Sequence, residues 1–354
     1  MKTRSLKFAI TFVLVMIVSC DEPETVVTDI VHPDGSVTRR IEMKTIQKNF
    51  EVSDVQVPFD STWTVRDSVE ILGDDDMPDV DTIWVKRAEK LFRSVDELNQ
   101  SYLADSSGNR DSRRRTEFKR TFKWFNTEYR FAEIIEKRLQ NGYPLSDFLN
   151  EEELQWFYSP DAITEEKRNG PDSLKFKTLD DTISKKTDYW ILKCMASEWS
   201  AEFARLAAGK AGPDLSRESL KAREAEFIKL VETSGKDFDS LWNNGIILKD
   251  FLGEENGQKF QIEADSAANM VAELIFFNFD DYTLRIVMPG ELIGANGFAD
   301  STGMMQWPVK SDFFITEPYV MWVESKTSNK WAWIVTGIFL LFVLAGIIFR
   351  AVRK

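Results

Sequence analysis

Two long apolar runs lie at opposite ends of the chain and set its expected topology. Residues 8–18 are apolar apart from one threonine and end shortly before Cys20, whereas residues 331–349 carry no charge at all. At ~1.5 Å per residue, a helix formed by the second run spans ~28 Å, close to the ~30 Å hydrocarbon core of a bilayer. The pattern predicts one C-terminal transmembrane helix at residues 331–349, followed by a short tail at residues 350–354.

The first apolar run has the layout of an export signal, because Lys2, Arg4 and Lys7 precede it and "IVSC" closes it. Small residues before a cysteine resemble the lipobox of bacterial lipoproteins, in which the signal peptidase cuts before the cysteine and a diacylglycerol is attached to its sulfur. We therefore expect residues 1–19 to be a lipoprotein signal peptide and Cys20 to be the lipidation site. The alternatives are an ordinary cleaved signal and an uncleaved anchor.

The charges beside the second run predict its orientation. Trp331 and Trp333 stand at one edge, as interfacial aromatics do, and Arg350, Arg353 and Lys354 follow the other edge. The positive-inside rule favours a cytoplasmic C-terminus, although Lys326 and Lys330 on the other side make the charge difference small. The export signal decides the orientation, because it places residues 21–330 outside the cytoplasm. Because outer membranes hold barrels, a helical span indicates the inner (cytoplasmic) membrane, with the main domain in the periplasm.

Between the two runs, the pattern of apolar positions changes twice. Residues 20–85 and 276–327 contain short runs rich in valine, threonine and isoleucine around turn sequences such as "HPDG", which are typical of strands. Residues 86–275 place apolar residues three and four apart, as in Ile191, Met195, Trp199 and Phe203, which is typical of helices. We predict an α+β fold, in which the N- and C-terminal parts form one antiparallel sheet around a large helical insertion.

Composition narrows the class of partner. The chain has a net charge of −13, and without the three bases at each end it holds 58 acids against 39 bases, a net charge of −19. That balance argues against nucleic acid as a partner. If Cys20 carries lipid, Cys194 has no partner for an intramolecular disulfide, and we expect it to be buried.

The sequence offers few groups for catalysis. His32 is the single histidine, and the chain contains no nucleophile elbow, zinc motif, phosphate-binding loop or dinucleotide-binding loop. We therefore expect no cofactor, no metal and no enzymatic activity. The alternative is a glycan or lipid hydrolase that uses paired carboxylates in the helical part. The acids Glu151, Glu152 and Glu153 are explained by the start of a helix, where negative charge is favourable.

A basic segment, "RDSRRRTEFKRTFKWFNTEYR", stands out in this acidic chain. Its aromatic residues recur at helical spacing, so we predict a helix that presents Arg113, Arg114, Arg115, Lys119 and Arg120 as a patch. Such a patch would bind an anionic lipid, an envelope polymer or an acidic protein. The alternative is a solvated face whose bases pair with acids elsewhere in the fold.

Several motifs together resemble the LppM-type family of bacterial lipoproteins: the lipobox, "PDGS", "VMPGELIGANG", "MQWPV" and the terminal helix with its basic tail. The resemblance implies a cell-envelope protein with an α+β domain and makes lipid a candidate ligand. It carries over no catalytic residues and does not extend to the helical insertion. We therefore expect a membrane-tethered lipoprotein that acts as a non-enzymatic binding or assembly module.

Overall fold

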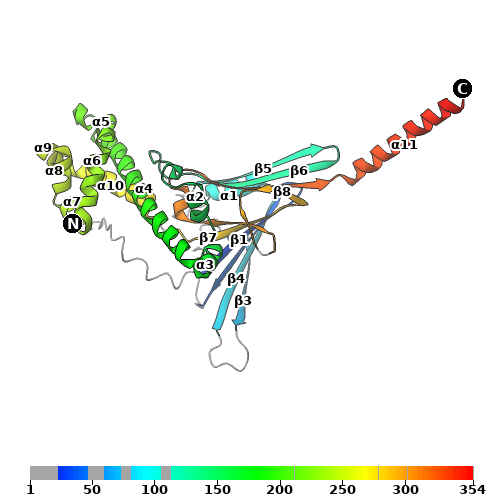
Figure 1. Ribbon diagram of the computed structural model, residues 1–354, viewed down its shortest axis with the longest axis horizontal. Coiled ribbons are helices and arrows are strands. Elements are labelled where there is room, and N and C mark those ends of the chain that lie inside the picture. Colours follow the sequence, from blue (N-terminus) through cyan, green and yellow to red (C-terminus); the bar gives the residue numbers. More distant parts are fainter. Residues whose placement is uncertain are drawn as a thin grey trace. The chain divides into compact units, whose positions relative to one another are not determined.

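The structure is a computed structural model that describes residues 23–46, 60–72, 81–104, 113–210, 212–277, 279–300 and 302–353. Its described part divides into two compact units. The sheet unit comprises residues 23–135, 282–309 and 320–354, and the helical unit comprises residues 136–281 and 310–319. Strands and helices are both abundant, which confirms the predicted α+β class (Figure 1).

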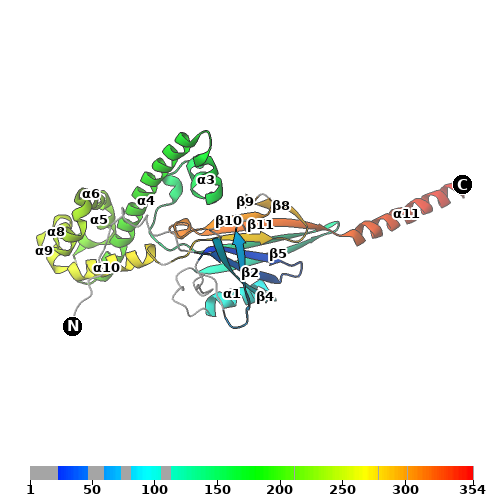
Figure 2. The same ribbon diagram turned by 90° about the horizontal axis from the view of Figure 1, so that it is seen from below.

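The larger sheet of the sheet unit joins strands from both ends of the chain. It has seven strands in the order β3-β4-β2-β1-β7-β10-β9 (Figures 1 and 2). The strands are β1 (Glu24–Val31), β2 (Val37–Thr45), β3 (Thr64–Leu72), β4 (Asp81–Phe92), β7 (Tyr282–Val287), β9 (Phe298–Ala299) and β10 (Met305–Val309). Neighbours pair antiparallel, apart from β1 and β7, which run parallel with Thr28 opposite Arg285. The predicted pairing across the insertion is therefore present, but this pair is parallel rather than antiparallel, and the strands form two sheets rather than one.

The turn between β1 and β2 is fixed by the residues that predicted it. Asp34 accepts a hydrogen bond from the Ser36 amide at 3.0 Å, as turn-forming aspartates do. Gly35 adopts a φ of 91°, in the region that favours glycine, and an added Cβ there would lie 2.9 Å from the Phe118 ring. The alternation of the flanking strands then buries Val27, Val31 and Ile41 on one face.

The smaller sheet has four strands in the order β5-β6-β11-β8. They are β5 (Arg114–Lys123), β6 (Asn126–Ile135), β8 (Glu291–Ala295) and β11 (Tyr319–Ser328). Helix α1 (Val95–Ala104) lies beside β5. The Asn99 side chain donates to the Thr116 backbone carbonyl at 2.9 Å and accepts from the Thr116 backbone N–H at 2.7 Å. This side chain occupies backbone groups that an edge strand otherwise leaves open.

The helical prediction for the basic segment is wrong. Residues 114–135 form the antiparallel hairpin β5–β6, with Phe118 opposite Phe131, and β4 extends to Phe92, so helices do not begin at residue 86. The spacing that suggested a helix is ambiguous, because residues four apart share a face in a strand as well as in a helix. Threonine and phenylalanine at alternate positions, as in Thr116 and Phe118, favour the strand.

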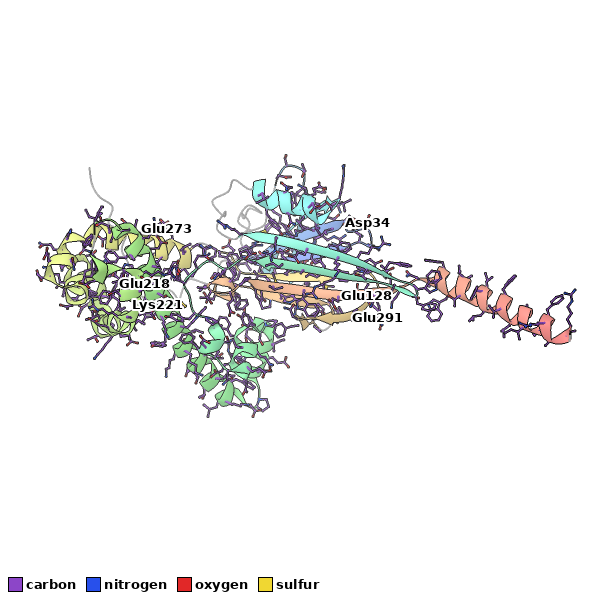
Figure 3. All side chains as sticks on the ribbon, turned by 90° about the horizontal axis from the view of Figure 1, so that it is seen from above. Asp34, Glu128, Glu218, Lys221, Glu273 and Glu291 are labelled. Carbon is purple, nitrogen blue, oxygen red and sulfur yellow. The ribbon has the colours of Figure 1, made fainter. Side chains whose placement is uncertain are left out.

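The helical unit holds a separate aromatic core. Its helices within the described residues are α2 (Glu151–Phe157), α3 (Asp161–Asn169), α4 (Ser173–Ala207), α5 (Arg217–Ala222), α6 (Glu224–Ser234), α7 (Phe238–Asn243), α8 (Ile246–Leu252), α9 (Glu254–Lys259) and α10 (Gln261–Ile275). The Trp199 ring of α4 stacks on Phe203 at 5.2 Å and on Phe227 at 4.5 Å. Glu218 and Lys221 of α5 and Glu273 of α10 lie on the exposed surface (Figure 3).

The helix α2 begins as its acids predict. Asn150 accepts a hydrogen bond from the Glu153 amide, and the Glu153 carboxylate in turn accepts one from the Asn150 amide. This reciprocal capping satisfies two backbone donors at the helix start. Lys186 also bonds Glu153, at 2.6 Å, and holds the pKa of that carboxyl below its usual range.

The C-terminal helix α11 (Lys330–Val352) belongs to the sheet unit and is apolar on all sides. It is long and apolar enough to cross a membrane, and only 6% of its most apolar stretch is buried (Figures 1 and 2). A helix that is apolar all round and exposed is typical of a membrane span rather than of a soluble core.

Candidate functional site

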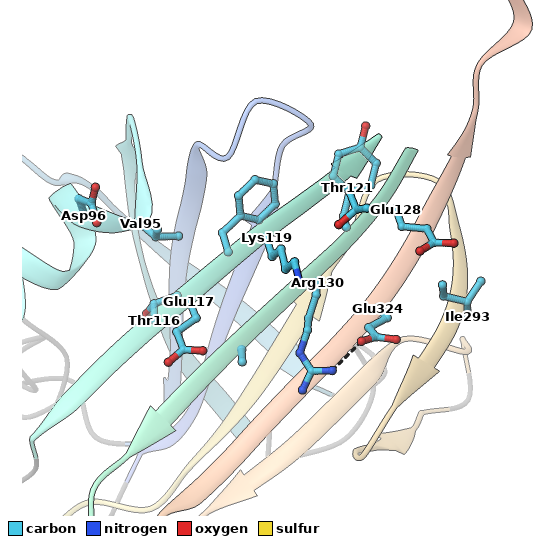
Figure 4. A pocket seen from close by; sticks show the side chains of 13 residues that line it. Val95, Asp96, Thr116, Glu117, Lys119, Thr121, Glu128, Arg130, Ile293 and Glu324 are labelled. Atoms are coloured by element: carbon cyan, nitrogen blue, oxygen red, sulfur yellow. Dashed lines mark hydrogen bonds and ion pairs between the residues drawn. The ribbon is translucent and has the colours of Figure 1, made fainter. Parts of the chain in front are cut away.

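The outer face of the four-stranded sheet forms an open groove of about 870 Å³ (Figure 4). Strands β5, β6 and β11 form its floor, and Ile293 of β8 lies at one side. Because alternate residues of a strand point to opposite faces, the odd-numbered residues of β5 line this groove. The exposed and half-buried polar side chains in it are Asp96, Glu117, Lys119, Thr121, Glu128, Arg130 and Glu324, and its lining also includes Thr116 and Tyr129, which are buried.

Ion pairs cross the groove from strand to strand. Arg130 of β6 bonds Glu324 of β11 at 2.5 Å, and its guanidinium lies 4.9 Å from the centre of the Trp322 ring. Lys123 of β5 pairs with Glu128 of β6, whereas Arg115 and Glu117 pair within β5, at 3.1 Å. These side chains are largely exposed, so each pair contributes less than about 1 kcal/mol to stability. The groove therefore presents both signs of charge rather than a uniform basic surface.

The structure divides the five residues of the predicted patch. Arg113, Arg115, Lys119 and Arg120 are exposed, but Arg114 is buried. Arg114 donates to the Tyr282 hydroxyl at 2.6 Å and lies 3.9 Å from Glu133. The expected single exposed patch is therefore wrong at Arg114, because a strand turns successive side chains to opposite faces. Among the described residues, Lys119 and Arg120 form no ion pair.

A buried ionic cluster, Asp29, Arg39 and Glu133, links the inner faces of the two sheets. Arg39 of β2 donates two hydrogen bonds to the Asp29 carboxylate of β1, at 2.7 Å and 2.6 Å, and one to the Glu133 carboxylate of β6, at 2.5 Å. Its remaining nitrogen donates to the Tyr102 hydroxyl of α1. Sequence reasoning missed this cluster, because the pairing of residues 39 and 133 depends on how the two sheets face each other.

Burial governs the electrostatics of this cluster. It raises the pKa of Asp29, against the opposing effects of the charge and bonds of Arg39. Burial alone would lower the pKa of Arg39, but the two carboxylates outweigh it and raise that pKa well above its usual value. Burial also raises the pKa of Tyr282 to about 12, so this phenol remains a neutral partner for Arg114. The cluster is a structural link whose three members are buried and bonded to one another.

Two buried acids of the helical unit, Glu198 and Glu224, accept hydrogen bonds from one loop. Glu198 accepts from the Asn141 amide at 2.7 Å, and Glu224 accepts from the Tyr143 hydroxyl at 2.9 Å and 2.8 Å. Burial, with help from Glu224, raises the pKa of Tyr143 to about 12. Cys194 is buried beside this loop, as predicted, and burial raises the pKa of its thiol to about 11. The hydrogen bonds to Glu198 of α4 and Glu224 of α6 hold residues 141–143 against these two helices.

Two further predictions concern Cys20 and metals. Cys20 lies outside the described residues, so its lipidation stays a prediction. Within the ranges that the structure describes, no three or more histidine, cysteine or acidic side chains converge as metal ligands would.

His32, the single histidine of the chain, lies in the β1–β2 turn and forms a hydrogen bond with the Thr38 hydroxyl at 2.9 Å.

These features define an α+β protein with two β-sheets, a helical unit and an exposed apolar C-terminal helix. No family model and no curated protein matches the chain. Among solved structures, it is similar to the LppM folded domain of Mycobacterium tuberculosis, at 9% identity and a TM-score of 0.25. That match covers 87% of this chain and 92% of the other. LppM is thus a weak structural neighbour.

Proposed function

We propose that this chain is a membrane-tethered cell-envelope lipoprotein that acts as a non-enzymatic binding or assembly module. The observation that carries the proposal is α11, whose apolar side chains are exposed around its whole circumference. Exposed apolar surface on this scale is unfavourable in water and favourable in a bilayer. The sheet unit, from which α11 extends, is then held at the membrane surface.

The proposed orientation follows from the residues at each end of α11. Trp331 and Trp333 precede the apolar stretch, and Arg350 and Arg353 follow it. By the positive-inside rule the C-terminus is cytoplasmic and the two units are periplasmic. Lipid on Cys20 would add a second attachment to the same inner membrane.

The binding face that we assign to the module is the outer groove of the four-stranded sheet. Its volume of about 870 Å³ and its open form suit a segment of a polymer or a polypeptide better than an enclosed small molecule. Its exposed charges of both signs suit a ligand that carries polar groups along its length. Arg130 over Trp322 supplies a flat surface between the charged residues.

The tether is tested in a Cys20→Ser background, where lipid cannot hold the chain. Arginines in place of Leu340 and Leu344 should release the chain from membranes that have been washed with carbonate. Two arginines at the helix centre oppose insertion by about 5–7 kcal/mol. The matched control is Ala351→Arg with Val352→Arg, which adds the same charges at the helix end. Release of both variants, or of neither, would contradict a span by α11.

The binding face is tested by placing a photo-crosslinking residue at Glu117, an exposed position in the groove away from the hairpin tip, in the full chain in its native membrane. We expect an adduct there, a lower yield with Arg130→Gln, and a further fall as salt rises. Ser68, exposed on β3 of the other sheet, is the control position. Equal adducts at both positions would reject the groove. Hydrolysis of envelope glycan or lipid that is lost in Glu198→Gln or Glu224→Gln of the helical unit would favour the hydrolase instead.

A further inference from the structure

The tip of the β5–β6 hairpin is bonded to the start of α11. The Asn329 amide donates to the Phe125 carbonyl at 2.9 Å, and its side-chain nitrogen donates to the Lys123 carbonyl at 2.8 Å. Thr127 donates to the Asn329 side-chain oxygen at 3.0 Å. Asn329, the residue before α11, is therefore bonded to both sides of the hairpin turn. The tip and the first turns of α11 form one connected structure.

Aromatic side chains from both elements meet at this junction. Trp124 lies 5.3 Å from Trp331, Phe125 lies 4.2 Å from Trp333, and Phe122 lies 6.2 Å from Trp331, measured between ring centres. All five rings remain exposed, with exposed fractions between 38% and 58%. Soluble surfaces rarely gather so much exposed aromatic area, whereas aromatic belts at membrane interfaces do.

The junction also defines a depth along α11. The Trp124 indole donates to the Thr336 hydroxyl at 2.9 Å. Thr336 is six residues beyond Lys330, which corresponds to about 9 Å along the helix axis. If the span begins near Trp331, the hairpin tip reaches the boundary between headgroups and acyl chains. Tryptophan prefers this depth, because its ring is apolar and its N–H is polar.

Basic residues follow directly along the strand. Arg120 is two residues from Phe122 and Lys119 is three, which places them about 7–10 Å from Phe122 at ~3.3 Å per residue. This distance matches the headgroup layer, since headgroups add about 5–8 Å to each side of the hydrocarbon core. Among the described residues, neither base forms an ion pair, so both are available to phosphate groups.

We propose that the β5–β6 hairpin tip is a second membrane-contact site: Phe122, Trp124 and Phe125 enter the interfacial layer, and Lys119 and Arg120 bind anionic lipid headgroups. The inference rests on the proposed function, because it needs α11 to span the bilayer. The occupant is lipid rather than another protein, since the cluster surrounds the end of a helix whose own surface requires lipid. Direct hydrogen bonds to Asn329 and Thr336 hold the tip beside the first two turns of α11.

The first experiment measures quenching of Trp124 by lipids brominated near the headgroup end of their acyl chains. The full chain is inserted into phosphatidylcholine vesicles that contain phosphatidylglycerol. The contribution of each tryptophan is taken as the difference between the wild type and a Trp→Phe variant. We expect the Trp124 contribution to be quenched several-fold more than that of Trp322, the control on the outer face of β11.

The outcomes separate this inference from the proposed function. Quenching of Trp331 and Trp333 without quenching of Trp124 would leave the span intact and overturn the hairpin contact. Quenching of none of the three would overturn both. Loss of Trp124 quenching on formation of a dimer would show that a second copy, not lipid, covers the tip, and would also overturn the inference.

The second experiment tests the headgroup contacts. In the wild type, brominated phosphatidylglycerol should quench Trp124 more than the same fraction of brominated phosphatidylcholine. Each base near an anionic leaflet favours the charged lipid by about fivefold, so Lys119→Gln with Arg120→Gln should remove most of this difference. Arg113→Gln, at the far end of β5, is the control. A preference that survives the double variant would reject binding by these two bases.

Discussion

Replacing Arg39 with methionine should lower the free energy of unfolding by about 3–5 kcal/mol, because the change leaves two buried carboxylates without their cation. Asp29 and Arg39 are fully buried in the structure, and Glu133 is 1% exposed. A buried ion pair and its isosteric apolar replacement are often similar in stability, whereas half of a pair is costly. The effect thus comes from the orphaned acids rather than from the strength of the original bonds.

Urea unfolding of the full chain in detergent measures this change, with Arg113→Gln as the control. Arg113 is exposed just before β5, so its loss should change the free energy by less than about 0.5 kcal/mol. Adding Asp29→Asn and Glu133→Gln to Arg39→Met should restore a large part of the loss. If the triple variant is no more stable than the single one, the cluster does not act through its charges.

The second large effect is expected in the other unit. Trp199→Ala should lower the stability of the helical unit by about 3–5 kcal/mol, as large core truncations do. The Trp199 ring packs on Phe203, Phe227 and Trp242, and its N–H bonds the Ala264 carbonyl at 3.2 Å. One ring thereby connects α4 to α6, α7 and α10, so its removal opens a cavity among four helices.

Hydrogen exchange resolved along the chain checks this prediction. Amides of α4, α6 and α10 should lose protection, while those of β1, β2 and β6 should retain it, because each unit has its own buried core. Leu174→Ala is the matched control, since Leu174 lies on the same helix with 79% of its side chain exposed. An equal loss of protection in the strands would mean that the two units unfold together.

The parts of the fold that sequence could predict are those with local signals. The turn at Asp34 and Gly35 depends on residues within the turn, and the buried face of α4 repeats every four positions along one helix. The hairpin β5–β6 has no such local signal. Phe118 and Phe122 are four residues apart, a spacing that places two side chains on one face of a helix and also on one face of a strand. The signal that distinguishes a strand here is the preference of threonines, such as Thr116 and Thr121, for β-strands.

The candidate sites were less predictable, because they depend on contacts between distant segments. Arg114 was placed in the patch by its neighbours in sequence, but its burial follows from the register of β5 against β6. The pair of Arg39 and Glu133 joins strands of different sheets, and Trp124 meets Thr336 across more than two hundred residues. No periodicity along a single chain encodes such partners.

The parallel pairing of β1 with β7 has a consequence for synthesis. Val26 pairs with Thr283, so the ribosome must add the intervening residues before β1 gains its second neighbour. At about 5–20 residues per second, this interval lasts on the order of 10–50 s. The edge of the β1–β2 hairpin stays open during that time, with Val27 and Ile30 beside it, and open apolar edges invite pairing with other chains. Until β7 is available, β1 therefore has one unpaired edge, and the larger sheet is complete only after residues 282–287 have been made.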